Sequence, residues 1–115
     1  MTDSDCLFCK IGRGDIPSQT VYQDDTVMAI EDINPVAPVH ILIIPKEHIP
    51  SAADLNQGHA EMLGKVFAAA AQIATKKGIA EQGFRIVTNH GLFGGQAVPH
   101  LHFHLLGGRK LDTMG

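Results

Sequence analysis

Hydrophobic residues recur with two different periods along the chain, and these periods predict five strands and one long helix. Short apolar runs at 20–23, 27–30, 40–44 and 84–88 are typical of strands, and a fifth run at 100–106 alternates histidine with apolar residues. Asp24 and Asp25 predict a hairpin turn between the first two strands. Pro45 is expected to stop the third, which reads as a buried strand.

A longer apolar period between the third and fourth strands predicts the helix. Its core positions are spaced by three or four residues: Met62, Val66, Ala69, Ala70 and Ile73. Asp54 or Asn56 can cap its start, and Gly78 can end it. Residues 6–12 read as a short helical turn. The expected fold is α+β: a single domain over 1–115, with a five-stranded, mostly antiparallel sheet, the long helix on one face and a short N-terminal helix.

Composition narrows the class of protein. Of 115 residues, 44% are hydrophobic and 18% are charged, an ordinary globular balance, and the formal net charge is −3. That charge gives no general attraction to nucleic acid or to an anionic membrane surface, so neither is expected as a partner. The polar first five residues lack the pattern of a signal peptide, and no apolar run could span a bilayer. A cytoplasmic location is therefore expected.

The alternating histidines are the strongest chemical signal. On a strand, His100, His102 and His104 would share one face, with the apolar residues between them on the other. A histidine-rich surface strand and a single zinc site are the simpler interpretations. Imidazoles about 7 Å apart at each step do not readily share one ion, which favours separate roles.

The segment before the histidines indicates phosphate chemistry. Gly94 and Gly95 precede the run, and glycines let backbone N–H groups approach an anion closely. A neutral imidazole can attack phosphorus, displace the leaving group and form a phosphoramidate that water hydrolyses. This scheme needs no catalytic cofactor.

Two cysteines, Cys6 and Cys9, have the spacing of half a zinc site. Two reduced cysteines on a short helix, or a redox pair, are the alternatives. The spacing alone leaves all three open.

The motifs together resemble one known family. Gly94-Gly95-Gln96, the His100-x-His102-x-His104 run and Leu106-Gly107-Gly108-Arg109 resemble the histidine-triad superfamily, most closely its Hint-type purine nucleoside phosphoramidase branch. Upstream, the segments at 6–11, 32–35 and 40–49 match as well, so the resemblance covers about residues 6–109. It implies a HIT-like fold and cleavage of the P–N bond in purine nucleoside 5′-phosphoramidates, including aminoacyl-adenylate-like compounds.

The resemblance also implies roles for individual residues. His102 would be the nucleophile, with His104 and His40 contacting the phosphate and assisting proton transfer, and Asp32 would bind the ribose hydroxyls. The purine pocket would be lined by Phe8, Ile11, Ile16, Ile30 and Ile33. Asn89 and the backbone of Gly95, Gln96 and Ala97 would hold the phosphate. For the apolar set, a plain core is the simpler interpretation, and for Asp32 a turn.

Relatives that keep both cysteines imply a structural Zn²⁺ site. The remaining ligands would be His48 and His100, giving a closed set of two cysteines and two histidines. The family also implies a homodimer in which two sheets join into ten strands.

Three rival functions remain at this point. One is a dinucleoside polyphosphate hydrolase of the same superfamily, and the Gly107-Gly108-Arg109 ending favours the Hint branch over it. The others are a nucleotide-binding regulatory protein with incidental catalysis, and a metal-binding protein that uses the histidines and cysteines.

Overall fold

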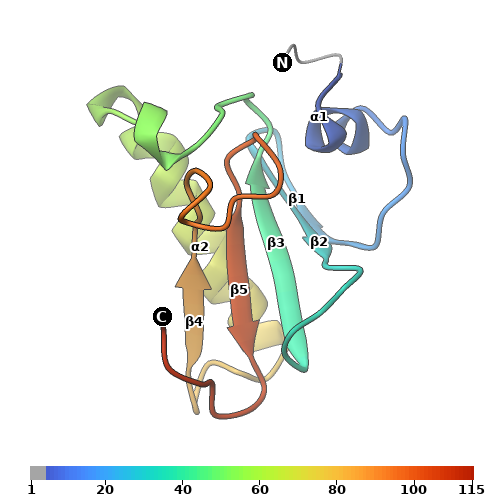
Figure 1. Ribbon diagram of the computed structural model, residues 1–115. Helices are drawn as coiled ribbons and strands as arrows, with labels where there is room; N and C mark the ends of the chain where they lie inside the picture. The colour runs from blue at the N-terminus through green and yellow to red at the C-terminus, as the bar shows by residue number, and fades with distance from the viewer. Residues whose placement is uncertain (1–4) are drawn as a thin grey trace.

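The fold is a five-stranded antiparallel sheet with helices on both faces, and a computed structural model describes it for residues 5–115 (Figure 1). The strands lie in the order β1-β2-β3-β5-β4, and each neighbouring pair is antiparallel. The strands are β1 (Thr20–Gln23), β2 (Val27–Glu31), β3 (Val39–Pro45), β4 (Phe84–Val87) and β5 (Phe103–Gly107). The helices are α1 (Leu7–Gly12) and α2 (Ala60–Lys76), with short 3-10 turns η2 (Ala52–Asp54) and η3 (Gln57–His59) between β3 and α2. The predicted fold class is confirmed.

Alternation along β3 divides the core into two layers. Ile41 and Ile43 belong to the cluster packed under α2, whereas Leu42 and Ile44 belong to the cluster that contains Phe8 of α1. Side chains on a strand alternate between faces, so one central strand supplies both layers. Figure 1 shows α2 behind the sheet, while α1 stands beside the strands near the N-terminus. The α2 face of the sheet therefore carries the larger buried cluster, and the other face carries Phe8 of α1 and the histidines.

The predicted limits of α2 are partly correct. Asn56 does act as a cap, but it caps η3, where its side chain accepts the N–H of Gly58 at 2.8 Å. The residue before α2 is His59, which makes no side-chain cap bond to this helix. At the other end, Gly78 follows the last residues of the helix with a φ of +74°, a conformation that glycine adopts without strain. The predicted glycine stop is thus confirmed, and the predicted cap belongs to the turn before the helix.

The fifth strand starts three residues later than predicted. His100, Leu101 and His102 precede β5 in non-strand backbone. Their backbone groups bond elsewhere: Leu101 donates its N–H to the Ile49 carbonyl at 2.6 Å, and the Thr88 hydroxyl donates to the His102 carbonyl at 2.8 Å. The expectation of three histidines on one regular strand is therefore wrong, because only His104 lies within β5.

Within residues 5–115, α2 is the longest helix, and neither it nor α1 is long and apolar enough to cross a membrane.

Candidate active site and metal site

His40 and His104 face each other across two neighbouring strands. In the β3–β5 ladder, His40 pairs with Leu106 and Leu42 pairs with His104. The two histidines are therefore diagonal neighbours on the face that carries Leu42, the face toward α1. Their ring centroids lie 5.2 Å apart, and His40 Nε2 lies 2.9 Å from His104 Nδ1. The strand register thus brings together two of the three predicted catalytic histidines.

Backbone contacts fix which ring nitrogens carry protons in this pair. Val36 donates its N–H to His40 Nδ1 at 3.1 Å, so this nitrogen holds a lone pair and the proton sits on Nε2. His40 Nε2–H then donates to His104 Nδ1, and the Asp32 carboxylate lies 3.3 Å from the same Nε2. His104, an acceptor at Nδ1, keeps its own proton on Nε2. Arg109 donates to the Val36 carbonyl at 3.1 Å and so holds in place the residue at which this series of hydrogen bonds begins.

His102 has the opposite tautomer to its neighbours. It is buried, and its Nδ1 lies 2.7 Å from the His100 carbonyl oxygen, which can only accept. Nδ1 therefore carries the proton, and Nε2 has a free lone pair. The ring lies edge-on to Phe8 and to His104, with centroids 5.1 Å away in each case. The site thus contains one imidazole with a lone pair at Nε2 beside another with a proton at Nε2.

Burial keeps the two facing histidines uncharged. Removal from water, together with the neighbouring His102 and His40 rings, lowers the pKa of His104 to about 4, and the Asp32 carboxylate opposes this shift. Burial also lowers the pKa of His40, again opposed by Asp32. Both rings are neutral at pH 7, in agreement with the hydrogen-bond chain.

Asp32, His40 and His104 also bring three donor atoms within 4.8 Å of one another. A metal-bound imidazole normally donates its second ring N–H to a neighbour. His40 cannot do so, because its Nδ1 accepts the Val36 N–H and a metal at Nε2 would require a doubly deprotonated ring. The hydrogen bonding of His40 therefore argues against a metal ion at this position.

The low pKa of His104 predicts a pH dependence of stability. An unfolded histidine titrates near 6.5, so between pH 6.5 and about 4 the unfolded chain binds a proton that the folded chain does not. The stabilisation is complete above pH 6.5 and is lost as the pH falls through this window. As the pH falls through this window, the free energy of unfolding measured in urea should decrease more for wild type than for His104→Gln. The difference should be up to about 1 kcal/mol per pH unit, since the ring is only half-buried. Parallel pH profiles for the two proteins would contradict the assigned shift.

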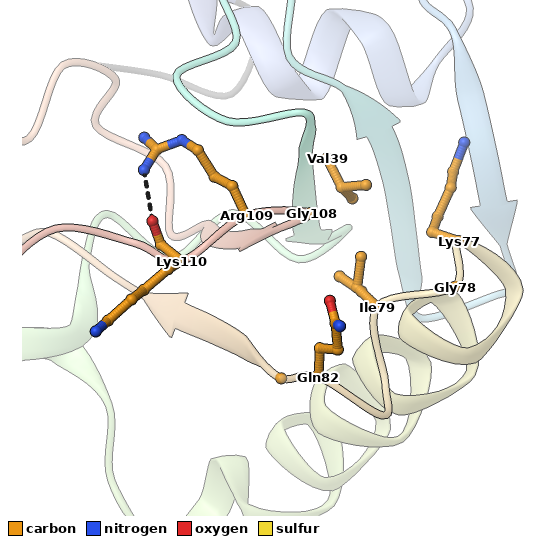
Figure 2. A pocket seen from close by; sticks show the side chains of 9 residues that line it. Val39, Lys77, Gly78, Ile79, Gln82, Gly108, Arg109 and Lys110 are labelled. Atoms are coloured by element: carbon orange, nitrogen blue, oxygen red, sulfur yellow. Dashed lines mark hydrogen bonds between the residues drawn. The ribbon is translucent and has the colours of Figure 1, made fainter.

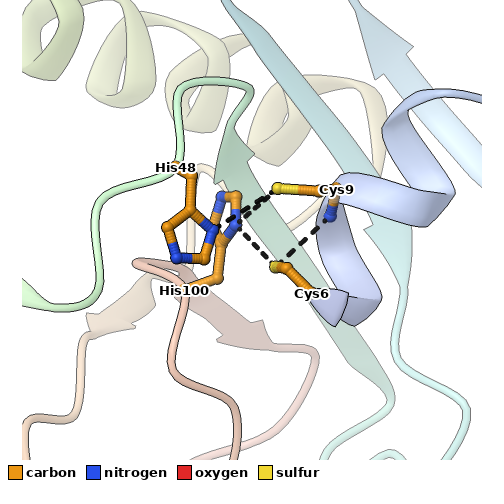
Figure 3. Close-up of side chains that lie close together, drawn as sticks. All are labelled: Cys6, Cys9, His48 and His100. Atoms are coloured by element: carbon orange, nitrogen blue, oxygen red, sulfur yellow. Dashed lines mark hydrogen bonds between the residues drawn. The ribbon is translucent and has the colours of Figure 1, made fainter. Parts of the chain in front are cut away.

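Cys6, Cys9, His48 and His100 form a second cluster (Figure 3). His100 Nδ1 lies 3.1 Å from Cys6 Sγ and 3.6 Å from Cys9 Sγ, and His48 Nδ1 lies 3.4 Å from Cys9 Sγ. All four donor atoms lie within 4.8 Å of one another. His100 Nε2–H donates to the Pro45 carbonyl at 2.8 Å, which leaves Nδ1 as a lone pair facing the sulfurs. Unlike the Asp32 group, these residues fit a zinc ion.

The glycine-rich loop before the histidines is braced internally. Asn89 donates its side-chain amide to the Gly94 carbonyl at 2.6 Å, and Gly95 and Gln96 donate their N–H groups to carbonyls of the same loop at 3.1 and 3.0 Å. The Gln96 side chain also ties the loop to the segment after β3. A phosphate contact from Gly95 or Gln96 would have to share a hydrogen already in use. Their phosphate role, like that of Ala97, stays a prediction.

The predicted purine-pocket residues separate into two groups. Phe8 and Ile30 are buried together, and Ile11 packs against the same cluster. Ile16 is partly buried, and Ile33 is 91% exposed. The first group lies beside His102 through Phe8, whereas Ile33 lies in the loop after β2 next to Asp32. The assignment of these residues to a purine pocket stays a prediction.

A separate cavity of about 540 Å³ lies at the C-terminal end of α2, away from these histidines. Figure 2 shows Ile79 and Gln82 beside it, with the side chains of Arg109 and Lys110 extending away from them. Lys77, on the same rim, donates to Glu31 at 2.9 Å. The cavity contains none of the predicted catalytic, nucleotide-binding or metal residues.

Some contacts at the site could not be read from the sequence. Buried Ser51 is hydrogen-bonded to His90 Nδ1 at 2.7 Å and so ties the segment after β3 to the glycine-rich loop. A serine before a helical turn suggests a cap, and Ser51 does accept the Ala53 N–H at 3.2 Å. No local pattern indicated its distant histidine partner.

Comparison with known proteins agrees with this geometry. The HIT domain family matches residues 13–111. A purine nucleoside phosphoramidase of Escherichia coli strain K12 is 52% identical over 108 residues, covering 94% of this chain and 91% of that protein. A 14 kDa zinc-binding protein of Zea mays is 45% identical, covering 97% of this chain and 88% of that protein. Among solved structures, a histidine triad protein from Clostridium difficile has a TM-score of 0.94 at 45% identity, with both chains covered completely. A HIT family hydrolase from Clostridium thermocellum has a TM-score of 0.92 at 49% identity, with 96% of each chain covered.

Proposed function

Because the chain belongs to the HIT domain family, we propose that it hydrolyses the P–N bond of purine nucleoside 5′-phosphoramidates through a nucleotidyl-histidine intermediate. The chain is a histidine-triad nucleotide hydrolase, and the name of its E. coli relative supports this choice of substrate. The observation that carries the proposal is the tautomer of His102, whose Nδ1–H donates to the His100 carbonyl at 2.7 Å. That bond leaves Nε2 ready to act as a nucleophile.

The reaction takes place in two displacements at one phosphorus. His102 Nε2 attacks the α-phosphorus, the P–N bond to the amine breaks, and the amine leaves with a proton taken from solvent water. The nucleotide is now joined to His102, whose Nδ1–H still donates to the His100 carbonyl and spreads the positive charge of the ring. Water then attacks the same phosphorus, the bond to Nε2 breaks, and a proton of the water passes to solvent. The nucleoside monophosphate is released with His102 restored.

In this reaction His104 acts as a hydrogen-bond donor, and His40 holds His104 in position. His104 Nε2–H, on the ring beside His102, can donate a hydrogen bond to a phosphoryl oxygen or to the departing amine. Its orientation depends on His40, which donates to His104 Nδ1 at 2.9 Å. Asp32 Oδ1 accepts the Asn34 N–H at 2.7 Å, while Oδ2 lies near His40, and its partly exposed carboxylate would accept the ribose hydroxyls. Phe8, Ile30 and Ile11 would form the purine wall.

The zinc site is part of the same proposal. Cys6, Cys9, His48 and His100 would hold one structural Zn²⁺, and the zinc-binding maize relative supports this assignment. A zinc ion held by these four residues would supply stability. The catalytic step is left to the imidazoles.

The direct test is hydrolysis of an adenosine 5′-phosphoramidate, with the product amine and AMP quantified together. Wild type should release both in equal amounts, and intact mass after acid-free quenching should show a transient adduct. Faster cleavage of a dinucleoside polyphosphate would assign the chain to the other enzymatic branch. Tight AMP binding without turnover of either substrate would indicate a regulatory binding protein instead.

We further propose that the chain forms a homodimer through β4. Strand β4 is an edge of the sheet and pairs with β5 on its inner side. Phe84 at its start and Phe67 on α2 are both partly exposed, 40% and 50% respectively. An unpaired edge flanked by apolar side chains is a template for pairing with a second copy, which would extend the sheet across a twofold axis.

Substitution of the edge phenylalanine should dissociate this dimer. Light scattering should give wild type a mass about twice the 12.3 kDa of one chain, and Phe84→Lys a mass near one chain, because a charge would be buried at the joint. Phe93→Lys is the matched control, since Phe93 is fully exposed in the glycine-rich loop. A monomeric wild type, or a Phe84→Lys dimer, would contradict the interface.

A further inference from the structure

The two cysteines of the cluster differ in their exposure to solvent. Cys6 is fully buried, whereas Cys9 is partly exposed. Cys9 also lines a cavity of about 230 Å³ beside α1, which has room for several molecules of the size of water. The residues that line this cavity are Phe8, Cys9, Gly12, Arg13, Met28 and Lys46. A small reagent can therefore approach Cys9 from solvent, while Cys6 is shielded.

The two sulfurs lie close enough to react with each other. Their atoms belong to the cluster whose donor atoms all lie within 4.8 Å of one another, and Figure 3 shows both side chains turned toward the imidazoles. Cys6 Sγ already accepts the Cys9 N–H at 3.4 Å, because positions three apart on a helical turn share one face. The spacing of two residues between the cysteines is also the spacing of reversible dithiol–disulfide pairs. The same turn can therefore present two thiolates to a metal or join them in a disulfide.

We propose that Cys9 is an oxidation site at which hydrogen peroxide converts the zinc-binding pair into a Cys6–Cys9 disulfide. This inference rests on the zinc site of the proposed function, because it gives the same two cysteines a second, metal-free state. The Cys9 thiolate attacks one oxygen of the peroxide, the O–O bond breaks, and hydroxide leaves, so that Cys9 becomes a sulfenic acid. The Cys6 thiolate then attacks Cys9 Sγ, the S–O bond breaks, and a second hydroxide leaves.

This reaction removes both sulfur ligands in one oxidation. The two sulfurs together give up two electrons, the peroxide takes them, and solvent protons convert the two hydroxides to water. Lys46 brings a positive charge to the wall of the cavity, which favours the negative charge that moves to the departing oxygen. Only His48 and His100 remain as ligands, fewer than a structural zinc site needs, so the ion is released. A thiol reductant restores the pair.

The test adds hydrogen peroxide to wild type and measures two quantities. Zinc release is followed with a colorimetric chelator, and the tryptic peptide of residues 1–10, which holds both cysteines, is weighed before and after reduction with dithiothreitol. Cys6→Ser and Cys9→Ser are a matched pair that each keep one cysteine. They are treated with peroxide in the presence of dimedone, which traps sulfenic acids. Circular dichroism establishes that each variant is folded, and the wild-type measurements do not depend on either.

We expect wild type to lose its zinc while the peptide becomes lighter by about 2 Da, the mass of two hydrogens, and to regain this mass on reduction. Folded Cys6→Ser should form the dimedone adduct at Cys9 about tenfold faster than folded Cys9→Ser forms one at Cys6, because only Cys9 is accessible. Zinc release with both thiols intact, or faster trapping at Cys6, would overturn the inference. If wild type holds no zinc before oxidation, the zinc assignment fails, and the peptide mass still decides whether the disulfide forms.

Discussion

Replacing His102 with alanine should lower phosphoramidate turnover by about 10³- to 10⁴-fold and abolish the nucleotidyl adduct. The reason is chemical, because in the proposed mechanism His102 Nε2 forms the bond to phosphorus and water alone must then replace it. AMP binding should persist, since Phe8, Ile30 and Asp32, which we propose contact the nucleoside, remain in place. Steady-state kinetics, intact mass and AMP titration on one preparation would measure all three effects.

His59→Ala is the control for this experiment. It removes a histidine of η3, outside both clusters, and should keep the wild-type rate. Thermal unfolding of both variants is needed because His102 is buried and its removal leaves a cavity. If folded His102→Ala turned over substrate at the wild-type rate, another residue would have to be the nucleophile. Its neighbour His104 would be the first to test.

The fold could be predicted from the sequence because its strands follow simple patterns. The continuous apolar run in β3 correctly indicated a strand buried on both faces. The Asp24-Asp25 turn correctly predicted the β1–β2 hairpin, and Asp24 Oδ1 accepts the Val27 N–H at 2.7 Å there. The predicted start of β5 was wrong because the alternation of histidine and apolar residues continues back through His102 to His100. The backbone groups of this segment bond outside the strand ladder.

The residue types at the site could be predicted from the sequence, but their protonation could not. The resemblance indicated His40 and His104, and the structure places them 2.9 Å apart. Their tautomers depend on a backbone N–H of Val36 and, for His102, on the His100 carbonyl. Every residue has such backbone groups, so no sequence pattern marks the ones that matter. For the same reason, the hydrogen bonds within the glycine-rich loop could not be predicted from the sequence.

Removal of zinc should produce the largest loss of stability. A chelator should lower the free energy of unfolding by about 3 to 4 kcal/mol, or Tm by roughly 10 °C or more, because a tightly bound ion stabilises only the folded chain. The cluster joins three segments distant in sequence: α1, the segment after β3 at His48, and the segment before β5 at His100. Calorimetry with and without chelator, alongside zinc analysis, would measure the effect.

The Cys6→Ser variant separates the metal-binding role of Cys6 from its role as a helix cap. Cys6 also caps α1, where its sulfur accepts the Cys9 N–H at 3.4 Å, and serine is a good substitute in that role. The variant should therefore keep α1 but unfold at the Tm of chelated wild type, and added chelator should lower it no further. An unchanged Tm in chelated, zinc-free wild type would show that the hydrogen bonds of the cluster suffice to hold these segments.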